Sequence, residues 1–524
     1  MKTKTTLKTI GEEQIKKAYS TLVKYKESKG ELERRIVENE EWFKLRCCGE
    51  KSSEEEIKQS SGWLFNSIIN KHADAMDSFP EPNVLPREKN DKEHAAALSA
   101  ILPVVLDQCG FEQTYSDVWW YKLKTGTGIY GVFWNSALQG GLGDIDIKQI
   151  DILNLFWQPG IKNIEQSENV FYVQAVEKEK LCSLYKVDPQ SLKSAAPLLE
   201  AYRLSDGVYE DNKALVVDWY YKKNIDGYEV LHYCKFVGDT VLFASENDER
   251  YARRGFYDHG KYPFIFDTMF VTEGSPAGFG YIDVMKGCQR SIDRLDSAIL
   301  RNTLIGETPR WFISDAAGIN EEEYADWSRP FIHTTGRIDD QTLKQVKVEG
   351  VSATALELLQ YKVEELKETS GNRDFVQGGT KYGVTAASAI LALQEAGGKL
   401  ARDMIKSSFR AYSDICYLCV ELIRQFYTEP RSFRIISKES GVDFITYNNQ
   451  NIVGKEGVLN LLRKPIFDIK IVPQKQNPYK KAQQNELAKE LFSLGMLSPD
   501  RREEARMAIK IMDFEGKEEL LSQL

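Results

Sequence analysis

The sequence predicts an α+β protein in which helices and antiparallel sheets occupy separate stretches of the chain. Between residues 274 and 427, apolar side chains recur at spacings of three, four and seven, which is the repeat of amphipathic helices. Between residues 130 and 244, short runs rich in β-branched and aromatic residues are joined by Gly, Asn and Asp turns. A chain of 524 residues is long enough for about two to four compact units.

The N-terminal part is predicted to be helical over residues 11 to 79, where apolar residues lie among dense charge. Pro80 and Pro82 end this run because proline cannot continue a helix. A further helical pair is expected from Asp91 to Lys124, with a break at Pro103.

The β-rich region that follows is predicted to be mainly antiparallel, because its runs are short and separated by turn residues. Asp226-Gly227 is a strong signal for a two-residue hairpin loop. The expected strands are Tyr130–Trp134, Asp144–Ile150, Val170–Ala175, Ala214–Tyr221, Glu229–Phe236 and Thr240–Ala244.

Two helices with narrow apolar stripes are predicted at residues 282–306 and 351–370. Ser352 is a candidate N-cap of the second helix. A single narrow stripe needs a neighbouring helix to cover it, so the two helices are expected to pack as an antiparallel column. The stripes consist of Ile282, Met285, Ile292, Leu295 and Ile299 in the first helix, and Leu356, Leu359, Val363 and Leu366 in the second.

Residues 307–350, between these helices, are predicted to form a strand, a short helix and two further strands. Asn320 and Glu323 have the spacing of a capping box, which starts the short helix that runs through Trp327.

A glycine-rich loop is predicted at residues 371–385, because glycines at positions 371, 378, 379 and 383 favour mobility. One long helix, residues 386–428, is expected next, with a kink at Gly397-Gly398. At about 42 residues it would extend roughly 63 Å. Strands are expected at Phe433–Ile436 and Phe467–Val472, and helix from Asn477 onward.

The charge balance argues against tight binding of nucleic acid. Lys and Arg number 69 against 78 Asp and Glu, which gives a formal net charge of -9. Proteins that grip DNA phosphates are usually basic, so this chain is not expected to clamp DNA tightly. We find no apolar run of about 20 residues and no signal-peptide core, so we expect the protein to stay in the cytoplasm where it is made. The eight cysteines are expected to be reduced and mostly buried.

Three motifs suggest site chemistry but have simpler structural explanations. Gly126, Gly128 and Gly131 match G-x-G-x-x-G, yet a helix precedes them and a strand follows, the reverse of a dinucleotide-binding turn. Cys416-x-x-Cys419 lacks a second ligand pair for zinc and is expected to be core packing. Asp144 and Asp146 could bind a metal, but alternation along a strand is the simpler explanation.

The sequence contains no G-x-x-x-x-G-K-[ST] phosphate-binding loop, no G-x-S-x-G elbow and no convincing acid pair. We therefore expect no enzyme activity, no cofactor, no metal and no catalytic residue. The chain is therefore not expected to hydrolyse ATP itself.

The order of these elements resembles the portal proteins of tailed double-stranded DNA bacteriophages, in which stem helix, clip, stem helix, tunnel loop and long helix follow one another. Gly280-Tyr-Ile-Asp-Val-Met-Lys-Gly-Cys-Gln289 is similar to the start of the portal stem. Asp293 stands where that pattern has an asparagine, which removes an amide donor. Gly383-Val-Thr-Ala-Ala-Ser-Ala-Ile resembles the start of the family's long helix, with Ala387 where a glycine is common.

This resemblance implies a phage-portal-like α+β fold that assembles as a ring, most simply of twelve subunits. It divides the chain as follows: wing 1–281 (a helical N-terminal part, then a β-rich part), stem helix 282–306, small α/β clip 307–350, stem helix 351–370, tunnel loop 371–385, long wing helix 386–428, wing return strands 429–476 and helical crown 477–524.

The resemblance also implies functional residues. Arg373 and Lys381 in the tunnel loop would contact DNA phosphates in the channel, and stem cations are secondary candidates for its wall: Arg290, Arg294, Arg301, Lys362 and Lys367. Some of the stem cations are expected to pair with acids of the neighbouring subunit. The clip would present Glu321, Glu322, Tyr324, Trp327 and Arg329 to partners.

The implied function is a channel at one capsid vertex for DNA packaging and ejection. The expected partners are further copies of the chain, double-stranded DNA, terminase, head-completion or adaptor proteins, and major capsid and scaffolding proteins, without a membrane. The protein would lie at the portal vertex of the virion, and in the host cytoplasm during assembly. Two other interpretations stay open: an oligomeric cytoplasmic nucleotide-binding enzyme that uses the Gly126 loop, and another structural virion protein such as an adaptor or capsid component.

Overall fold

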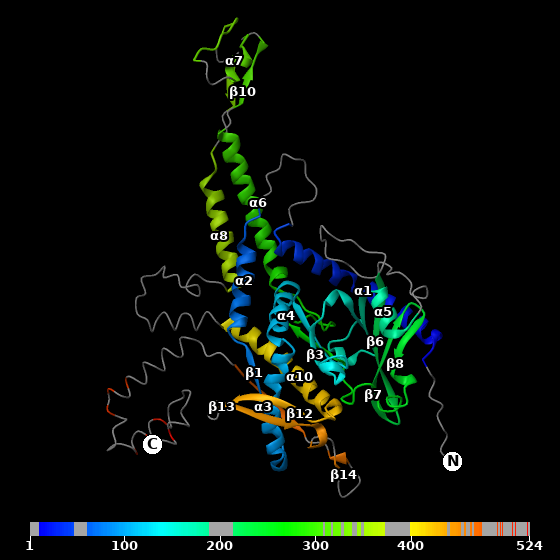
Figure 1. Ribbon diagram of the computed structural model, residues 1–524. Helices are drawn as coiled ribbons and strands as arrows, with labels where there is room; N and C mark the ends of the chain where they lie inside the picture. The colour runs from blue at the N-terminus through cyan, green and yellow to red at the C-terminus, as the bar shows by residue number, and fades with distance from the viewer. Residues whose placement is uncertain are drawn as a thin grey trace. The chain divides into compact units, whose positions relative to one another are not determined.

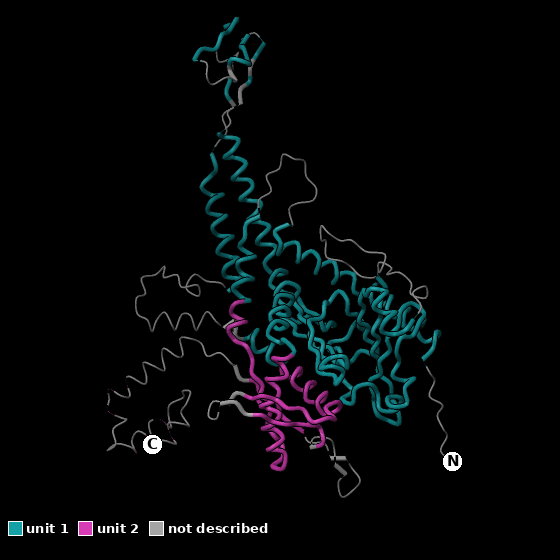
Figure 2. Tube along the Cα trace, in the orientation of Figure 1, with its two compact units in different colours: residues 1–72, 109–411 teal, residues 73–108, 412–524 magenta. Residues whose placement is uncertain are grey.

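The computed structural model describes residues 10–46, 60–187, 213–307, 310–315, 318–325, 330–337, 343–346, 350–371, 399–437, 441–451, 455–456, 462–463 and 466–473, with seven isolated positions between 490 and 521. The chain forms two units (Figure 2), one of residues 1–72 and 109–411 and one of residues 73–108 and 412–524. The first unit contains the helical hairpin and both larger sheets (Figure 1).

The largest sheet has five antiparallel strands in sequence order. They are β4 (Leu155–Trp157), β5 (Asn169–Glu177), β6 (Lys213–Ile225), β7 (Tyr228–Val237) and β8 (Thr240–Ala244). Asp226 and Gly227 join β6 to β7 with φ values of 52° and 89°. A two-residue loop with positive φ at both positions matches the twist of the strands, so the predicted hairpin is confirmed.

The two faces of this sheet are covered by different helices. Helix α1 (Glu12–Phe43) places Ile15, Ala18 and Leu22 in a core with one face. Helix α5 (Lys178–Tyr185) packs Leu181 in a second cluster with alternate residues such as Val216. The alternation along β6 therefore serves two cores, as the period of two in a strand requires.

A second sheet has three antiparallel strands in the order β3-β2-β9, formed by β3 (Asp144–Gln149), β2 (Thr127–Asn135) and β9 (Phe264–Thr268). Helix α4 (Phe111–Thr125) leads directly into β2. Short 3-10 turns lie between the larger elements throughout the described chain. They are η1 (Lys89–Asp91), η2 (Gln139–Gly141), η3 (Ile152–Asn154), η4 (Ile164–Gln166), η6 (Ser245–Asn247) and η8 (Asn449–Asn451).

Two long helices form the hairpin where the sequence predicted them, α6 (Tyr281–Glu307) and α8 (Ala353–Ser370). They pack side by side (Figure 1). The Ser352 hydroxyl accepts a hydrogen bond from Ala355 N at 3.3 Å, and Gly371 ends α8 with φ 71°. Both caps supply partners or geometry that a helix end otherwise lacks.

The segment between these helices contains β10 (Arg310–Ile313), α7 (Glu321–Ala325) and β11 (Leu343–Val346), with β10 and β11 paired. In the described part, the third predicted strand is reduced to a single bridge between Ile319 and Thr334. Asn320 caps α7 through Glu323 N at 3.4 Å. Asn320 N itself donates to the His333 carbonyl at 3.3 Å, and the Glu323 carboxylate accepts from His333 N and Nδ1.

The second unit is built on long-range pairing. Strand β1 (Pro80–Pro86) pairs antiparallel with β16 (Phe467–Pro473), and helix α3 (Lys92–Gln108) packs on β1. The Ser99 hydroxyl on α3 accepts from Val84 N at 2.8 Å and donates to Val84 O at 3.0 Å. The other strands are β12 (Arg431–Ser437), β13 (Gly441–Tyr447), β14 (Lys455–Glu456) and β15 (Leu462–Arg463).

The predicted break at Pro103 is wrong, because α3 continues through this proline to Gln108. The residues around Pro103, among them Ile101, Leu102 and Val105, are buried, and their packing outweighs one missing hydrogen bond. The chain instead turns at Gly110, whose φ of 63° favours glycine.

Helix α2 (Trp63–Met76) and α10 (Lys399–Phe426) each contribute to both units, α10 with residues up to Ala411 in the first and from Tyr412 in the second. The predicted long helix is thus observed from residue 399. The predicted kink at Gly397-Gly398 and the helix from Asn477 lie outside the continuously described residues. No single described helix is long and apolar enough to cross a bilayer, and Lys89–Gln108 and Phe111–Thr125 reach that length and hydropathy only when counted together.

Candidate functional site

The hairpin of α6 and α8 is the feature that the fold presents most distinctly. The apolar seam between the helices is narrow: Ile292 and Leu366 are buried, but Leu356 remains 46% exposed. The Cys288 thiol lies 3.1 Å from the Lys362 carbonyl oxygen and fixes which residues of the two helices lie opposite each other. The faces directed away from the seam carry charge, so the hairpin is only partly covered within one chain.

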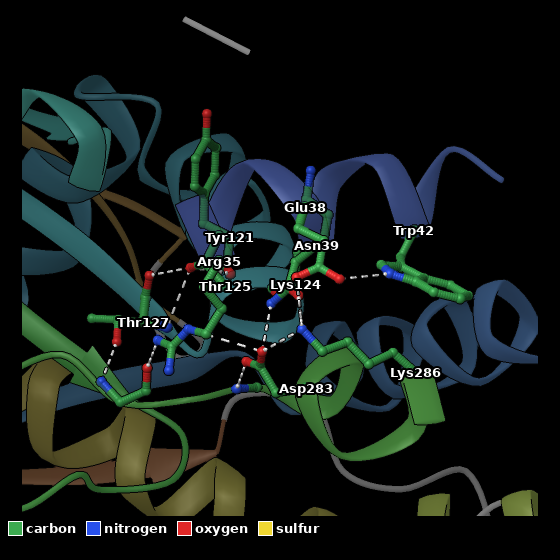
Figure 3. Close-up of polar contacts among 12 residues, drawn as sticks. Arg35, Glu38, Asn39, Trp42, Tyr121, Lys124, Thr125, Thr127, Asp283 and Lys286 are labelled. Carbon is green, nitrogen blue, oxygen red and sulfur yellow. Dashed lines mark hydrogen bonds and ion pairs between the residues drawn. The ribbon is translucent and has the colours of Figure 1, made fainter. Parts of the chain in front are cut away.

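The first turn of α6 is anchored by Asp283 (Figure 3). Its carboxylate accepts from Gly280 N at 3.0 Å and from Asn39 Nδ2 on α1 at 3.0 Å. Asn39 Nδ2 also donates to the Lys124 carbonyl at 3.1 Å, at the end of α4. An acid in the first turn is favoured by the free N–H groups of a helix start. Asp283 thereby joins three helices at one point.

The loop before α6 is held from both sides. The Arg35 guanidinium donates to the Gly278 carbonyl at 2.5 Å, and Gly278 N donates to the Thr127 hydroxyl at 2.9 Å. These bonds fix the path of the chain into the hairpin (Figure 3).

Cations surround Glu38 on the next turn of α1. Lys286 Nζ lies 3.1 Å from one carboxylate oxygen, and Arg290 Nη2 lies 3.7 Å from the other. Trp42 Nε1 donates to the same carboxylate at 3.3 Å. Partial burial opposes ionisation of Glu38, but these partners outweigh it and hold its pKa below the usual range.

Two buried side chains of α6 cap helix α2. Gln289 Oε1 accepts from Leu64 N at 3.0 Å, and its amide nitrogen donates to Ser61 O at 2.9 Å. Asp293 accepts from Ser61 N at 2.9 Å and from the hydroxyls of Ser60 and Ser61. Every described partner of Asp293 is a donor, so a carboxylate suits this position although the portal pattern has an amide.

The three glycines of the G-x-G-x-x-G match leave room for neighbouring backbone and side chains. Gly126 ends α4 with φ 86°, and a side chain there would collide with the backbone of Phe279. A side chain at Gly128 would collide with Val118, and one at Gly131 would collide with the side chains of Phe133 and Ile150. Outside the motif, a side chain at Gly280 would press on Gly126 N. The motif lies between a helix and a strand in that order, and its backbone is covered by the start of α6. This geometry leaves no phosphate cradle.

A buried ion pair ties α10 to the three-stranded sheet. Lys122 Nζ lies 2.7 Å from Asp267 Oδ1 and donates to the Ser408 hydroxyl at 2.8 Å, and both ionic side chains are fully buried. Ser408 donates in turn to Asp267 Oδ2 at 2.5 Å. Burial lowers the pKa of Lys122 against the opposing effect of Asp267. The start of α10 is thus fixed beside α4 and β9.

The predicted stem cations divide into two groups. Arg290 lies against Glu38 with its guanidinium 5.3 Å from the Trp42 ring centre, Lys362 pairs with Glu365 at 2.6 Å, and Lys367 lies over the Trp63 ring. Arg294 and Arg301 are exposed, and neither makes an ion pair or hydrogen bond to another residue that the structure describes. The predicted DNA-contacting residues Arg373 and Lys381 lie outside the described residues.

The segment 310–337 exposes both acids and apolar side chains. Glu321 and Glu322 are exposed, and Phe312 and Phe331 are 69% and 76% exposed. The side chain of Tyr324, and Trp327 and Arg329 entirely, lie outside the described residues. A two-stranded sheet that exposes an aromatic ring such as Phe312 is only marginally stable on its own.

The other motifs have structural surroundings. Cys416 and Cys419 are fully buried in α10, as expected for core packing, and burial raises the pKa of Cys416 to about 12. Asp146 pairs with Lys148 at 2.7 Å, and Asp144 accepts from Ile145 N at 2.8 Å. Within the described ranges, we find no group of three or more His, Cys, Asp or Glu residues placed to hold a metal ion.

Sequence reasoning singled out Gln289 and Asp293 but missed other buried polar side chains that hold elements together. Asn39, Lys122 and Asp267 were not predicted, although polar residues at buried positions of a helical or strand pattern were a usable signal. Such residues are buried only when they have partners, and the partners here come from distant segments.

Comparison with known families gives one finding. The sequence profile of the family described as phage P22-like portal protein matches residues 73–261 and 230–524, which together span most of the chain. No curated protein matches the chain. Family membership implies a structural protein of the capsid vertex that self-associates and interacts with capsid and terminase proteins. The family is a structural family and not an enzyme family. The chain therefore belongs to the phage P22-like portal protein family and is a bacteriophage portal protein, the head-tail connector of the virion that serves genome packaging.

Proposed function

We propose that the protein assembles into a closed ring, most simply of twelve copies, whose central channel carries double-stranded DNA during packaging and ejection. The observation that carries this proposal is the α6–α8 hairpin, whose narrow seam leaves Leu356 and the charged outer faces uncovered in one chain. Lateral packing in a closed ring covers these faces equally in every copy.

In this proposal, residues 282–306 and 351–370 are the stem, 307–350 the clip, and 371–385 the tunnel loop. Residues 1–281, 386–428 and 429–476 form the wing, and 477–524 the crown. The Asp283 and Asp293 networks support this division, because they attach the proposed stem rigidly to the proposed wing through α1, α2 and α4.

The test of the ring is negative-stain electron microscopy with mass determination of the purified protein. We expect rings with a central hole and a mass near twelve times 59.9 kDa. A compact dimer or tetramer without a hole at any protein concentration contradicts the proposal.

We further propose that Arg373 and Lys381 make transient contacts with passing phosphates. The overall charge of -9 supports contacts that guide DNA without holding it, since such contacts are screened by salt. The double variant Arg373→Gln/Lys381→Gln is expected to form rings but to package DNA more slowly. The matched variant Arg253→Gln/Lys180→Gln, which removes two exposed charges elsewhere, is expected to package normally. Equal packaging rates of both variants contradict this role.

The clip is proposed to bind terminase during packaging and head-completion proteins afterwards, while the wing and crown meet capsid and scaffolding proteins during assembly in the host cytoplasm. Exposed acids at Glu321 and Glu322 and exposed aromatic rings at Phe312 and Phe331 support a docking surface, to which Tyr324, Trp327 and Arg329 also belong in the proposal. Glu321→Lys/Glu322→Lys is expected to weaken terminase binding to intact rings. Unchanged binding contradicts the surface.

A further inference from the structure

The outer faces of the two hairpin helices carry opposite charge. Successive helical residues turn by about 100°, so positions seven apart lie on one face. On α6, Arg294 and Arg301 have this spacing and face away from the Cys288–Ile292 seam; we call them the basic stripe. On α8, Glu357 and Glu364 have the same spacing and face away from the Leu359–Leu366 seam; we call them the acidic stripe.

Neither stripe finds a charged partner among the residues that the structure describes. The four side chains are exposed and form no ion pair with any residue in the described part of the structure. Tyr361 lies between the two acids on the same face and is 62% exposed. A planar ring beside carboxylates suits an arginine, which can pair with the acid and stack on the ring.

The stripes also match in height. Cys288 lies opposite Lys362, and the helices run in opposite directions. Six residues further along α6 is Arg294, and six residues back along α8 is position 356, beside Glu357. In a ring whose stems run along the axis, equivalent residues of all copies lie at equal height, so Arg294 of one copy faces Glu357 of the next.

The two cations nearer the start of α6 are not available for this contact. Lys286 and Arg290 lie on the same side of the helix, but Glu38 of α1 binds both. The surface open to another chain therefore starts at Arg294.

We infer that the basic stripe of each copy binds the acidic stripe of the next copy, so that α6 and the neighbouring α8 meet back to back around the ring. This inference rests on the ring of the proposed function, and it assigns Arg294 and Arg301 to the subunit interface instead of the channel wall. The partner of each stripe is the opposite stripe of a second copy of this chain. The complementary charges and the shared seven-residue spacing support this pairing.

The test uses charge reversal of whole stripes, so that a small shift in register does not matter. Arg294→Glu/Arg301→Glu and Glu357→Arg/Glu364→Arg each place like charges in every interface. We expect each variant to lose at least tenfold in the fraction of protein in rings, measured by mass photometry. The variant with all four changes restores the pairing in every interface and is expected to regain rings.

Mixing separates pairing between chains from pairing within a chain. When the two double variants are combined in equal amounts, alternating copies place opposite charges at every interface, so rings are expected to reappear. If only the fourfold variant forms rings and the mixture does not, the stripes pair within one chain and the inference is overturned.

Controls keep this test separate from the ring proposal and from folding. Lys24→Glu/Lys180→Glu changes the net charge equally at exposed sites of α1 and α5 and is expected to assemble normally. Circular dichroism of each variant must show the wild-type melting transition. Wild-type rings together with rings of both double variants refute the interface alone, whereas a wild-type protein that forms no ring refutes the proposed function and the interface with it.

As a measurement that does not depend on ring yield, Arg294→Cys chains are mixed with Glu357→Cys chains and treated with a short bismaleimide. We expect a covalent dimer of the two variants that neither variant forms alone. Absence of this dimer in assembled rings overturns the inference.

Discussion

The two ends of helix α6 lie in different chemical surroundings. From Asp283 to Asp293, its polar side chains are bound to α1, α2 and the loop before the helix, and Gln289 and Asp293 are almost fully buried. Further along the helix, Arg294 and Arg301 are exposed and form no ion pair with a described residue. One helix is thus attached firmly at its base and open to another molecule further out. The difference shows that burial and pairing within the chain separate a structural charge from one available for assembly.

The largest effect on stability is expected from the buried Lys122–Asp267 pair, which fixes the start of α10. Asp267→Ala leaves the Lys122 ammonium buried without its counter-charge and is expected to lower the free energy of unfolding by about 3–5 kcal/mol. Urea unfolding at low protein concentration measures this loss. The double variant Lys122→Met/Asp267→Leu removes both charges and is expected to be clearly more stable than the single one. A single variant as stable as the wild type would show that the pair is not structurally important.

The next effect comes from the close approach of α4 and the start of α6. Gly126→Ala must adopt a positive φ and also clashes with the Phe279 backbone. We expect a loss of about 2–4 kcal/mol from left-handed strain and overpacking together. Gly110→Ala is the matched control, because Gly110 also has positive φ but open space around it. Equal losses would mean that the backbone contact with Phe279 contributes nothing.

A smaller effect is expected at the Asp293 cap. Asp293→Asn turns one acceptor into a donor that faces Ser61 or Gln289, so stability should fall by about 1–2 kcal/mol. Asp296→Asn changes the same charge on the same helix without described partners and is expected to be neutral. Thermal melting compares the two, and an unchanged Asp293→Asn transition would show that the amide of the portal pattern serves equally well here.

The smallest effect on stability compares the two ends of α6 directly. Arg290→Gln is expected to cost under about 1 kcal/mol, as for other exposed ion pairs, and Arg294→Gln nothing measurable. The low pKa of Glu38 means that its contribution is present above the unfolded pKa and is lost as pH falls through the folded pKa. Arg290→Gln should therefore reduce the acid dependence of unfolding, while Arg294→Gln leaves it unchanged and weakens ring formation. If Arg294→Gln changed the acid dependence of unfolding and Arg290→Gln did not, the contrast between the two ends of α6 would be wrong.

Much of the fold could be predicted because its signals are local. Ser352 and Gly371 were recognisable as helix ends, Asp226-Gly227 as a hairpin loop, and the stripes of α6 and α8 as packing surfaces. Strand β1 could not be predicted in this way. Its three prolines indicate the end of a helix, and only the pairing with β16 makes this segment a strand.

The same distinction between local and long-range signals applies to the site. The sequence by itself determined the helical hairpin, the order of elements and the residues of its charged faces, since helical periodicity depends on neighbours within a few turns. Only the tertiary structure decided which polar and charged side chains find a partner within the chain. The partners are far apart in sequence, as in the pairs Asn39–Asp283, Lys122–Asp267 and Ser61–Asp293. Such pairs form only when folding brings distant segments together and removes water from between them, which local periodicity does not encode.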